Sequence, residues 1–285
     1  MIGYLEVIGA VSIWAFFNGI LVKNIKTSGA GVGMWTGLVG VLLFLASFVF
    51  GQTGSPFGEL TRPQIVALIY LGIFAALNNA CYYTALKKTQ VYNAALFHYF
   101  APMLTIVWIY FIPQFRSAIY PIDLVVLVIG FLGVLWIATP NFKGDRRWMY
   151  FASGSALFYS LELVFSSYVS GILNISPNTS SFFKLLFQAM IMPVAGLALR
   201  EPLRVENSGE VKKLIFGGVL LYLSFVLFFD GASQVRQLHL GLLSYIDRIG
   251  AIFLAAIFFK EKITKNALVG GICILGASLL VLFLR

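Results

Sequence analysis

The sequence predicts an all-α membrane protein whose ten transmembrane helices form two inverted five-helix repeats. Three observations carry this prediction: the composition, the spacing of apolar segments, and a similarity between the two halves of the chain. Hydrophobic residues make up 60% of the 285 residues and charged residues 11%, and the mean hydropathy is +0.90. Soluble domains are usually about half apolar and about a quarter charged, so the composition excludes an ordinary soluble domain.

Polar stretches divide the chain into ten apolar segments, and a membrane-spanning helix needs about 20 such residues. Turn-forming sequences separate them, such as KTSGAG at 26–31 and GQTGSP at 51–56. The first segment has no basic residue before it and no cleavage site of small residues, so we expect a retained span rather than a signal peptide. The predicted helices are 4–23, 31–50, 64–87, 90–111, 121–139, 147–170, 178–200, 211–234, 238–259 and 264–284.

Residues 82–104 resemble residues 228–250 at a constant offset of 146 residues, and the first segment resembles the sixth more loosely. Five spans are therefore followed by five similar spans, and an odd number per repeat places the halves in opposite orientations. This architecture is typical of secondary transporters, whose sites lie near mid-membrane between the repeats. We expect residues 1–142 and 143–285 to be the two units.

Two segments also resemble a known family. ALKKTQVYNAALFHYFAPMLTIVWIYF at 85–111 and FFKEKITKNALVGGICILGASLLVLF at 258–283 are similar to the paired signature segments of the EamA branch of the drug/metabolite transporter superfamily. The resemblance implies ten spans in two inverted halves and transport of small organic metabolites such as amino acids, amines and drugs. Members usually carry an acid followed by proline where this chain has Asp247-Arg248.

Motifs of other function classes are absent from the sequence. It has no phosphate-binding loop, no His-Glu-x-x-His and no Gly-x-Ser-x-Gly, so we expect no cofactor, no metal and no enzyme activity. The net charge of +9 would suggest nucleic acid in a soluble protein, but here the basic residues flank apolar segments. We expect a small-molecule carrier in the lipid bilayer, either monomeric or dimeric; an intramembrane enzyme and a passive pore are the alternatives.

Basic residues are distributed unequally between the two sets of loops. The side richer in Lys and Arg faces the cytoplasm, so the count favours both termini outside the cell membrane, whereas the family resemblance implies both inside. In either case both termini lie on the same side. The loops after segments one, three, five, seven and nine hold fourteen: Lys23, Lys26, Lys87, Lys88, Lys143, Arg146, Arg147, Arg200, Arg204, Lys212, Lys213, Lys260, Lys262 and Lys265; the other loops hold three: Arg62, Arg116 and Arg236.

Glu162 lies deep in a predicted span, within LFYSLELVFSSY at 157–168. An ionisable group at the centre of a span costs at least about 2.5–3.5 kcal/mol. One interpretation is a protonated carboxyl group hydrogen-bonded to a neighbouring helix; the other is a site for a cation or a coupling proton. Because so costly a position needs a reason, we favour the site.

Asp247 and Arg248 are adjacent within another apolar segment. Neighbours on a helix point about 100° apart, so each side chain can meet a different partner. A structural ion pair, for example Asp247 with Lys184, is one alternative. In the other, Arg248 receives a substrate carboxylate and Asp247 or Glu162 receives an amine. Arg248 aligns with Pro102, where a helix bends and exposes backbone carbonyls.

Four further polar residues have a predicted environment, and two of them, Lys184 and His98, are also candidate substrate-binding or coupling residues. Lys184 lies near the start of its segment, so we expect its amine to reach toward the membrane surface. Gln188 lies one turn later on the same face. His98 is deep in its segment, where a lone histidine is more often a satisfied core residue than a ligand, and His239 at a helix start is expected to be exposed.

Aromatic residues are expected to line the central cavity, because carboxylates within an aromatic wall suit an organic cation through cation–π attraction. With Arg248 present, an amino acid zwitterion suits the same wall. Asn18 is a further candidate, beside the counterpart of Glu162 in the first repeat. The predicted wall residues are Tyr99, Tyr245, Tyr159 and Trp14.

Overall fold

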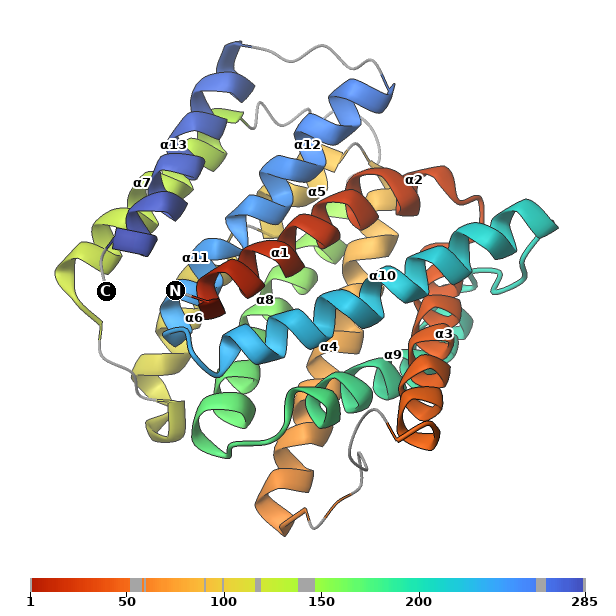
Figure 1. Ribbon diagram of the computed structural model, residues 1–285. Helices are drawn as coiled ribbons and strands as arrows, with labels where there is room; N and C mark the ends of the chain where they lie inside the picture. Colours follow the sequence, from red (N-terminus) through yellow and green to blue (C-terminus); the bar gives the residue numbers. More distant parts are fainter. Residues whose placement is uncertain are drawn as a thin grey trace.

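The computed structural model is built from helices (Figure 1). It describes residues 2–51, 58, 60–89, 91–98, 100–115, 119–137, 147–259 and 265–283, and these ranges contain no β-strand. The helices are α1 (Ile2–Phe16), the π-helix η1 (Phe17–Leu21), α2 (Val22–Asn24), α3 (Gly29–Val49), α4 (Arg62–Lys88), α5 (Val91–His98), α6 (Ala101–Phe111), the 3-10 helix η2 (Pro113–Phe115), α7 (Pro121–Ile137), α8 (Arg147–Ser167), the π-helix η3 (Tyr168–Ile172), α9 (Pro177–Leu199), α10 (Ser208–Ala232), α11 (Gln237–Leu243), α12 (Tyr245–Phe259) and α13 (Lys265–Phe283).

Several helices begin where the sequence supplies a capping side chain. The Ser28 hydroxyl accepts a hydrogen bond from the backbone N–H of Gly31 at the start of α3. At the start of α9, the Ser176 hydroxyl accepts one from the backbone N–H of Thr179. Asn207 caps α10, and Thr61 with Gln64 forms a capping box at the start of α4. These contacts satisfy backbone N–H groups that have no partner within the helix, which is why the helices begin close to the predicted positions.

Each predicted segment contains helix, but two of them are divided. Segment 90–111 contains α5 and α6, and segment 238–259 contains α11 and α12. Pro102 lies in the first turn of α6, and Ser244 between α11 and α12 donates a hydrogen bond back to Gly241 O at 2.6 Å; both features interrupt regular helix. Within the described ranges, six helices are long and apolar enough to cross a membrane: Ile2–Asn24, Gly29–Val49, Arg62–Lys88, Pro177–Leu199, Ser208–Ala232 and Gln237–Phe258.

Glycines allow two helix pairs to approach closely. Helix α3 packs along α9, and a Cβ atom on Gly37 would lie 3.0 Å from the backbone nitrogen of Ala189. Helices α7 and α13 lie side by side (Figure 1), and a Cβ atom on Gly133 would lie 2.8 Å from the carbonyl oxygen of Gly270. Small residues commonly make such contacts between membrane helices.

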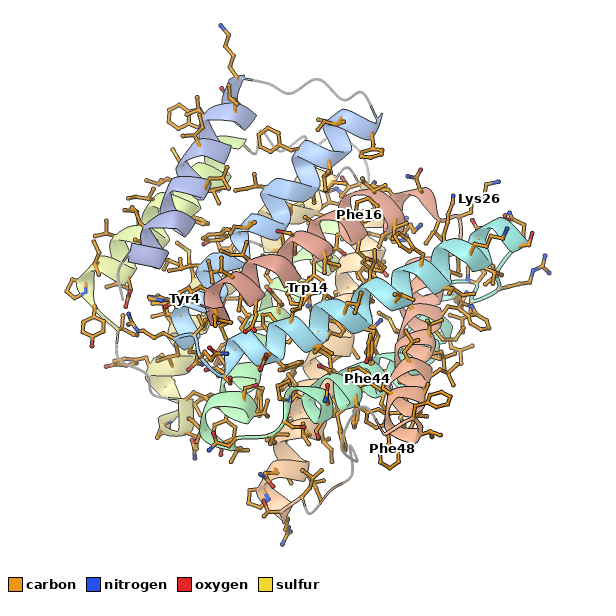
Figure 2. All side chains as sticks on the ribbon, viewed as in Figure 1. Tyr4, Trp14, Phe16, Lys26, Phe44 and Phe48 are labelled. Atoms are coloured by element: carbon orange, nitrogen blue, oxygen red, sulfur yellow. The ribbon has the colours of Figure 1, made fainter. Side chains whose placement is uncertain are left out.

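The remaining long helices enclose one shared core. Helix α4 packs along α8, and α1 packs along α10, so helices from the two halves of the chain alternate around the centre. Figure 2 shows Trp14 at this centre, between α1 and α10. Large apolar side chains such as Leu42, Tyr110 and Ile257 are exposed on the outside, which suits contact with lipid.

Candidate functional site

A small cavity of about 30 Å³, lined by polar and aromatic side chains, lies in the middle of the core. The first half of the chain contributes to it from α1, η1 and α4, and the second half from α8, α9, α10 and α12. The π-helix η1 places Asn18 in the wall, and π-turns within α-helices often occur at functional sites. The lining residues are Trp14, Phe17, Asn18, Asn78, Asn79, Tyr82, Tyr83, Tyr159, Glu162, Lys184, Leu221, Phe225 and Asp247.

Glu162 and Lys184 form an ion pair in the wall of this cavity. The Nζ atom of Lys184 lies 2.5 Å from Oε1 of Glu162, and neither side chain is more than 4% exposed. Lys184 is seven residues from the start of α9, which is about 10 Å along the helix axis. The predicted reach of Lys184 toward the surface is therefore wrong, because its carboxylate partner holds the amine in the protein interior.

A chain of hydrogen bonds extends from this ion pair to His98. The side-chain amide of Asn78 donates to Oε2 of Glu162 at 2.8 Å, and the Ser155 hydroxyl donates to Oδ1 of Asn78 at 2.8 Å. His98 Nδ1 lies 2.6 Å from the Ser155 hydroxyl, and the imidazole ring stacks on Tyr159 with centroids 4.5 Å apart. Asn78 on α4 thus connects the carboxylate on α8 to the first half of the chain.

The ammonium group of Lys184 is also surrounded by an aromatic cage, which we define as Trp14, Phe225, Phe228 and Phe229. The Nζ atom lies 3.9 Å from the centroid of the Phe225 ring, 5.2 Å from that of Trp14, 5.6 Å from that of Phe228 and 5.7 Å from that of Phe229. The Trp14 indole is fixed by a 2.8 Å hydrogen bond from Nε1 to the Ser224 hydroxyl. Ring faces attract cations, so carboxylate and cage together stabilise a positive charge.

Amide groups line the rest of the cavity. Asn79 donates to Oε1 of Gln188 at 2.7 Å, and Gln188 in turn donates to the carbonyl oxygen of Gly33 at 2.9 Å. Asn18 is only 7% exposed, and its Oδ1 atom has no hydrogen-bond partner among the described residues. A buried carbonyl oxygen without a partner costs free energy, so this atom favours a donor within the cavity.

The structure brings six of the ten predicted site residues to one cavity: Glu162, Asp247, Tyr159, Trp14, Asn18 and Lys184. His98 lies directly behind Tyr159. The suggested pairing of Lys184 with Asp247 is wrong, since Lys184 pairs with Glu162, and Asp247 is a separate, completely buried lining residue.

Three predicted residues lie elsewhere or outside the described parts of the chain. Tyr245 is buried away from the cavity, where its ring packs against Gly130 of α7, so it is not one of the lining residues. Tyr99 lies outside the described residues, and so does the side chain of Arg248. No sequence pattern indicates Asn78 or Phe225 as site residues, because an amide or a Phe at a buried helix position usually serves packing.

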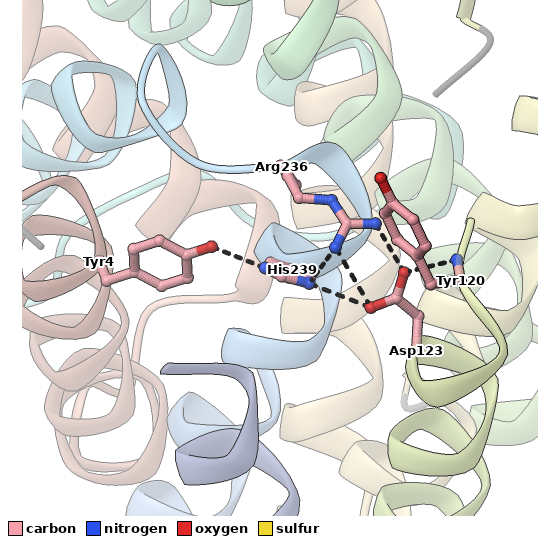
Figure 3. A network of polar contacts seen from close by, with 5 residues as sticks. All are labelled: Tyr4, Tyr120, Asp123, Arg236 and His239. Carbon is pink, nitrogen blue, oxygen red and sulfur yellow. Dashed lines mark hydrogen bonds and ion pairs between the residues drawn. The ribbon is translucent and has the colours of Figure 1, made fainter. Parts of the chain in front are cut away.

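A second polar network joins α1, α7 and α11 near the starts of these helices (Figure 3). Arg236 Nη2 lies 2.6 Å from Oδ2 of Asp123, and the guanidinium group lies 4.6 Å from the centroid of the Tyr120 ring. His239 lies 3.2 Å from Oδ1 of Asp123 through Nε2 and 2.7 Å from the Tyr4 hydroxyl through Nδ1. His239 is completely buried, so its predicted exposure is wrong: Tyr4 and Asp123 cover both ring nitrogens.

A third set of polar contacts lies at the opposite ends of the helices, near Lys26 in Figure 2. The Glu210 carboxylate accepts hydrogen bonds from the backbone of Lys26 at 2.5 Å and from the Thr27 hydroxyl at 2.8 Å. Lys87 donates to the carbonyl oxygen of Ile25, and Lys213 donates to that of Asn24 at 3.2 Å. Several of the basic residues counted on one side of the membrane therefore gather at one face.

The described residues place no group of three or more His, Cys, Asp or Glu side chains where it could hold a metal ion. The side chains that line the central cavity offer carboxylates, one amine, amides, phenol hydroxyls and aromatic rings. This set can bind and orient a small polar organic molecule.

Comparison with known proteins shows which protein family the sequence matches. Residues 1–139 and 146–283 match the model of the EamA-like transporter family. An uncharacterized transporter of Bacillus subtilis (strain 168), YojE, is 25% identical over 226 residues, which cover 77% of this chain and 71% of that protein. One solved protein crystal structure is similar in fold over 99% of both chains, with a TM-score of 0.78 and 18% identity.

Proposed function

Because the chain belongs to the EamA-like transporter family and is a membrane transporter of the drug/metabolite type, we propose that it is a secondary active carrier. It moves a small organic metabolite, an amine or organic cation or an amino acid, by alternating access around the central cavity. The observation that carries this proposal is the Glu162–Lys184 ion pair, buried in a cavity wall to which both halves of the chain contribute. Ionisable residues within membrane helices are costly and usually mark a substrate or ion pathway.

Helix packing supports two inverted repeats, residues 1–142 and 143–285. Under this pairing α1 corresponds to α8, and α4 corresponds to α10. The contact of α1 with α10 then mirrors the contact of α8 with α4, and α3 with α9 and α7 with α13 are pairs of counterparts. The divided segments, α5–α6 and α11–α12, are also counterparts. Discontinuous helices at matching positions commonly form transporter sites.

The cavity favours a ligand that carries positive charge. Two carboxylates, Glu162 and Asp247, and one lysine line it, together with aromatic rings and three side-chain amides. Glu162 would hold the substrate amine or the coupling proton, and Asp247 with Arg248 would set charge selection. The proposed energy source is a proton gradient, coupled to transport through Glu162.

We place the carrier in the cell membrane as a multi-pass protein with both termini on one side. An even number of crossings requires this arrangement, and the distribution of basic residues favours the outside. The exposed apolar side chains on the periphery suit direct contact with lipid.

Reconstitution into proteoliposomes tests the proposed function. A panel of radiolabelled amines and amino acids is offered with and without an imposed pH gradient, and protein-free liposomes are the control. We expect saturable uptake of at least one compound. Flux that rises without saturation would instead indicate a pore, and chemical conversion of a compound in detergent without any gradient would indicate an enzyme.

A further inference from the structure

The surroundings of Lys184 are those of a bound cation. One carboxylate oxygen lies 2.5 Å from its Nζ atom, and the nearest ring, Phe225, has its centroid 3.9 Å away. The three other rings of the aromatic cage complete the shell at 5.2–5.7 Å. Cages of aromatic rings with a carboxylate are a general way for proteins to bind organic ammonium groups.

The same surroundings disfavour an anion at this position. The face of an aromatic ring carries partial negative charge, so a substrate carboxylate that approached Lys184 through the cage would be repelled. On the side of the Lys184 amine that the cage leaves open, the Glu162 carboxylate already occupies the position that a substrate carboxylate would need. Lys184 is therefore poorly placed to receive the carboxylate of an amino acid, although its charge alone would suggest that role.

We propose that Lys184 is a built-in occupant of an organic-cation site, and that a substrate ammonium group replaces its amine between Glu162 and the aromatic cage. This inference rests on the transport function proposed above and narrows its substrate class to organic amines and cations. Lys184 then sets specificity by competition: only a cation that binds carboxylate and cage better than the tethered amine displaces it.

The position of the site within the cavity supports this replacement. Glu162, Lys184, Trp14 and Phe225 all line the cavity, so a ligand there reaches the carboxylate and two rings of the cage. Asn18 lines the same cavity, and its Oδ1 atom has no partner among the described residues. An ammonium group carries up to three N–H donors, so one can bond to the Glu162 carboxylate while another bonds to Asn18.

Removal of the lysine side chain provides a direct test. Lys184→Ala deletes a three-carbon chain with its ammonium group, and the added compound n-propylammonium has the same atoms. The matched control is Lys184→Met, which keeps an unbranched apolar chain in the cage and leaves no space. Binding is followed in detergent by the fluorescence of Trp14, with Trp14→Phe to subtract the other tryptophans, and by thermal unfolding.

The proposal predicts saturable binding of n-propylammonium to Lys184→Ala, about tenfold or more tighter than to Lys184→Met. Propionate and n-propanol, of similar size but negative or neutral, should not compete. Equal binding of n-propylammonium to both variants, no binding to Lys184→Ala, or tighter binding of propionate would overturn the proposal.

Folding of the variant is itself informative. If Lys184→Ala yields monodisperse protein only when n-propylammonium is present during purification, the cation site is supported. If it yields none in either condition, Lys184→Ser, which also leaves the space of the lysine side chain empty, is titrated instead, and an absence of cation preference there overturns the inference. The two proposals can fail separately. If n-propylammonium does not bind the Lys184 variant but the wild type shows saturable uptake of an amino acid, only this inference is contradicted. If n-propylammonium binds the variant but the wild type takes up no compound, only the transport function is contradicted.

Discussion

The Nζ atom of Lys184 on α9 lies 2.5 Å from Oε1 of Glu162 on α8, and both side chains are buried. The second oxygen of Glu162 accepts a hydrogen bond from Asn78 on α4, so three helices meet at one carboxylate. Removing one partner of a buried ion pair leaves an uncompensated charge, at a cost of roughly 3–5 kcal/mol, whereas replacing both partners with apolar groups is often neutral.

The ion pair therefore predicts a particular pattern in a double-mutant cycle. Glu162→Gln and Lys184→Met should each lower the thermal unfolding temperature in detergent, and the double variant should recover most of the loss. If the two losses simply add, the buried charges do not depend on each other and the pairing is contradicted.

Asn78→Ala should lower saturable uptake well below that of a control variant, even where the protein still folds. The substitution leaves Oε2 of Glu162 and the Ser155 hydroxyl without their shared partner, at a cost of roughly 1–3 kcal/mol. It also disconnects Glu162 from the first half of the chain. Ser12→Ala is the control, since Ser12 bonds only to its own helix at an exposed position. Uptake by Asn78→Ala equal to that of the control would exclude a role for Asn78 in transport.

Arg236→Lys should destabilise the network that joins α1, α7 and α11. Arg236 bonds to both oxygens of Asp123 and lies over the Tyr120 ring, and lysine lacks the planar fork that both contacts use. We expect the free energy of unfolding to fall by roughly 1–3 kcal/mol, which thermal unfolding in detergent measures. Arg62→Lys, at an exposed position at the start of α4, should have no effect; equal effects of the two substitutions would show that charge alone is needed.

Gly133→Ala should destabilise the pair formed by α7 and α13, whereas Gly276→Ala should be tolerated. A Cβ atom on Gly133 would lie 2.8 Å from the carbonyl oxygen of Gly270, and a Cβ atom on Gly276 would meet nothing within 4 Å. Overpacking of this kind typically costs about 1–3 kcal/mol. Thermal unfolding of the two variants measures the difference, and equal stability would mean that α7 and α13 are not in close backbone contact.

The distribution of basic residues predicts that both termini face outside. A cysteine added at either terminus should react with a membrane-impermeant maleimide in intact cells. Reaction only after the cells are opened would show the opposite orientation, which the family resemblance implies.

Helix positions could be predicted from the sequence because apolar length and capping residues are local signals. Glu162 could be singled out as a candidate site residue because a carboxylate deep in an apolar segment is costly wherever the helix packs. Its partner could not be predicted, because the approach of Lys184 depends on the packing of α9 against other helices, and a lysine near a helix end is equally compatible with the surface.

The network around Asp123 was missed for the same reason. Tyr4, Asp123 and His239 are far apart in the chain, and each lies near a helix start, where a polar residue is usually solvated. Only the packing of α1, α7 and α11 brings them together. Tyr245 shows the converse case: it was predicted to line the cavity, but packing turns its ring toward Gly130.

Uptake of an organic amine into proteoliposomes by the wild type and by the double variant Glu162→Gln, Lys184→Met tests the central claim most directly. The double variant is expected to fold, since it removes both buried charges together, but it lacks the carboxylate that binds the cation. The account predicts saturable uptake by the wild type and none above protein-free liposomes for the double variant. Uptake by the double variant at the wild-type rate would contradict it.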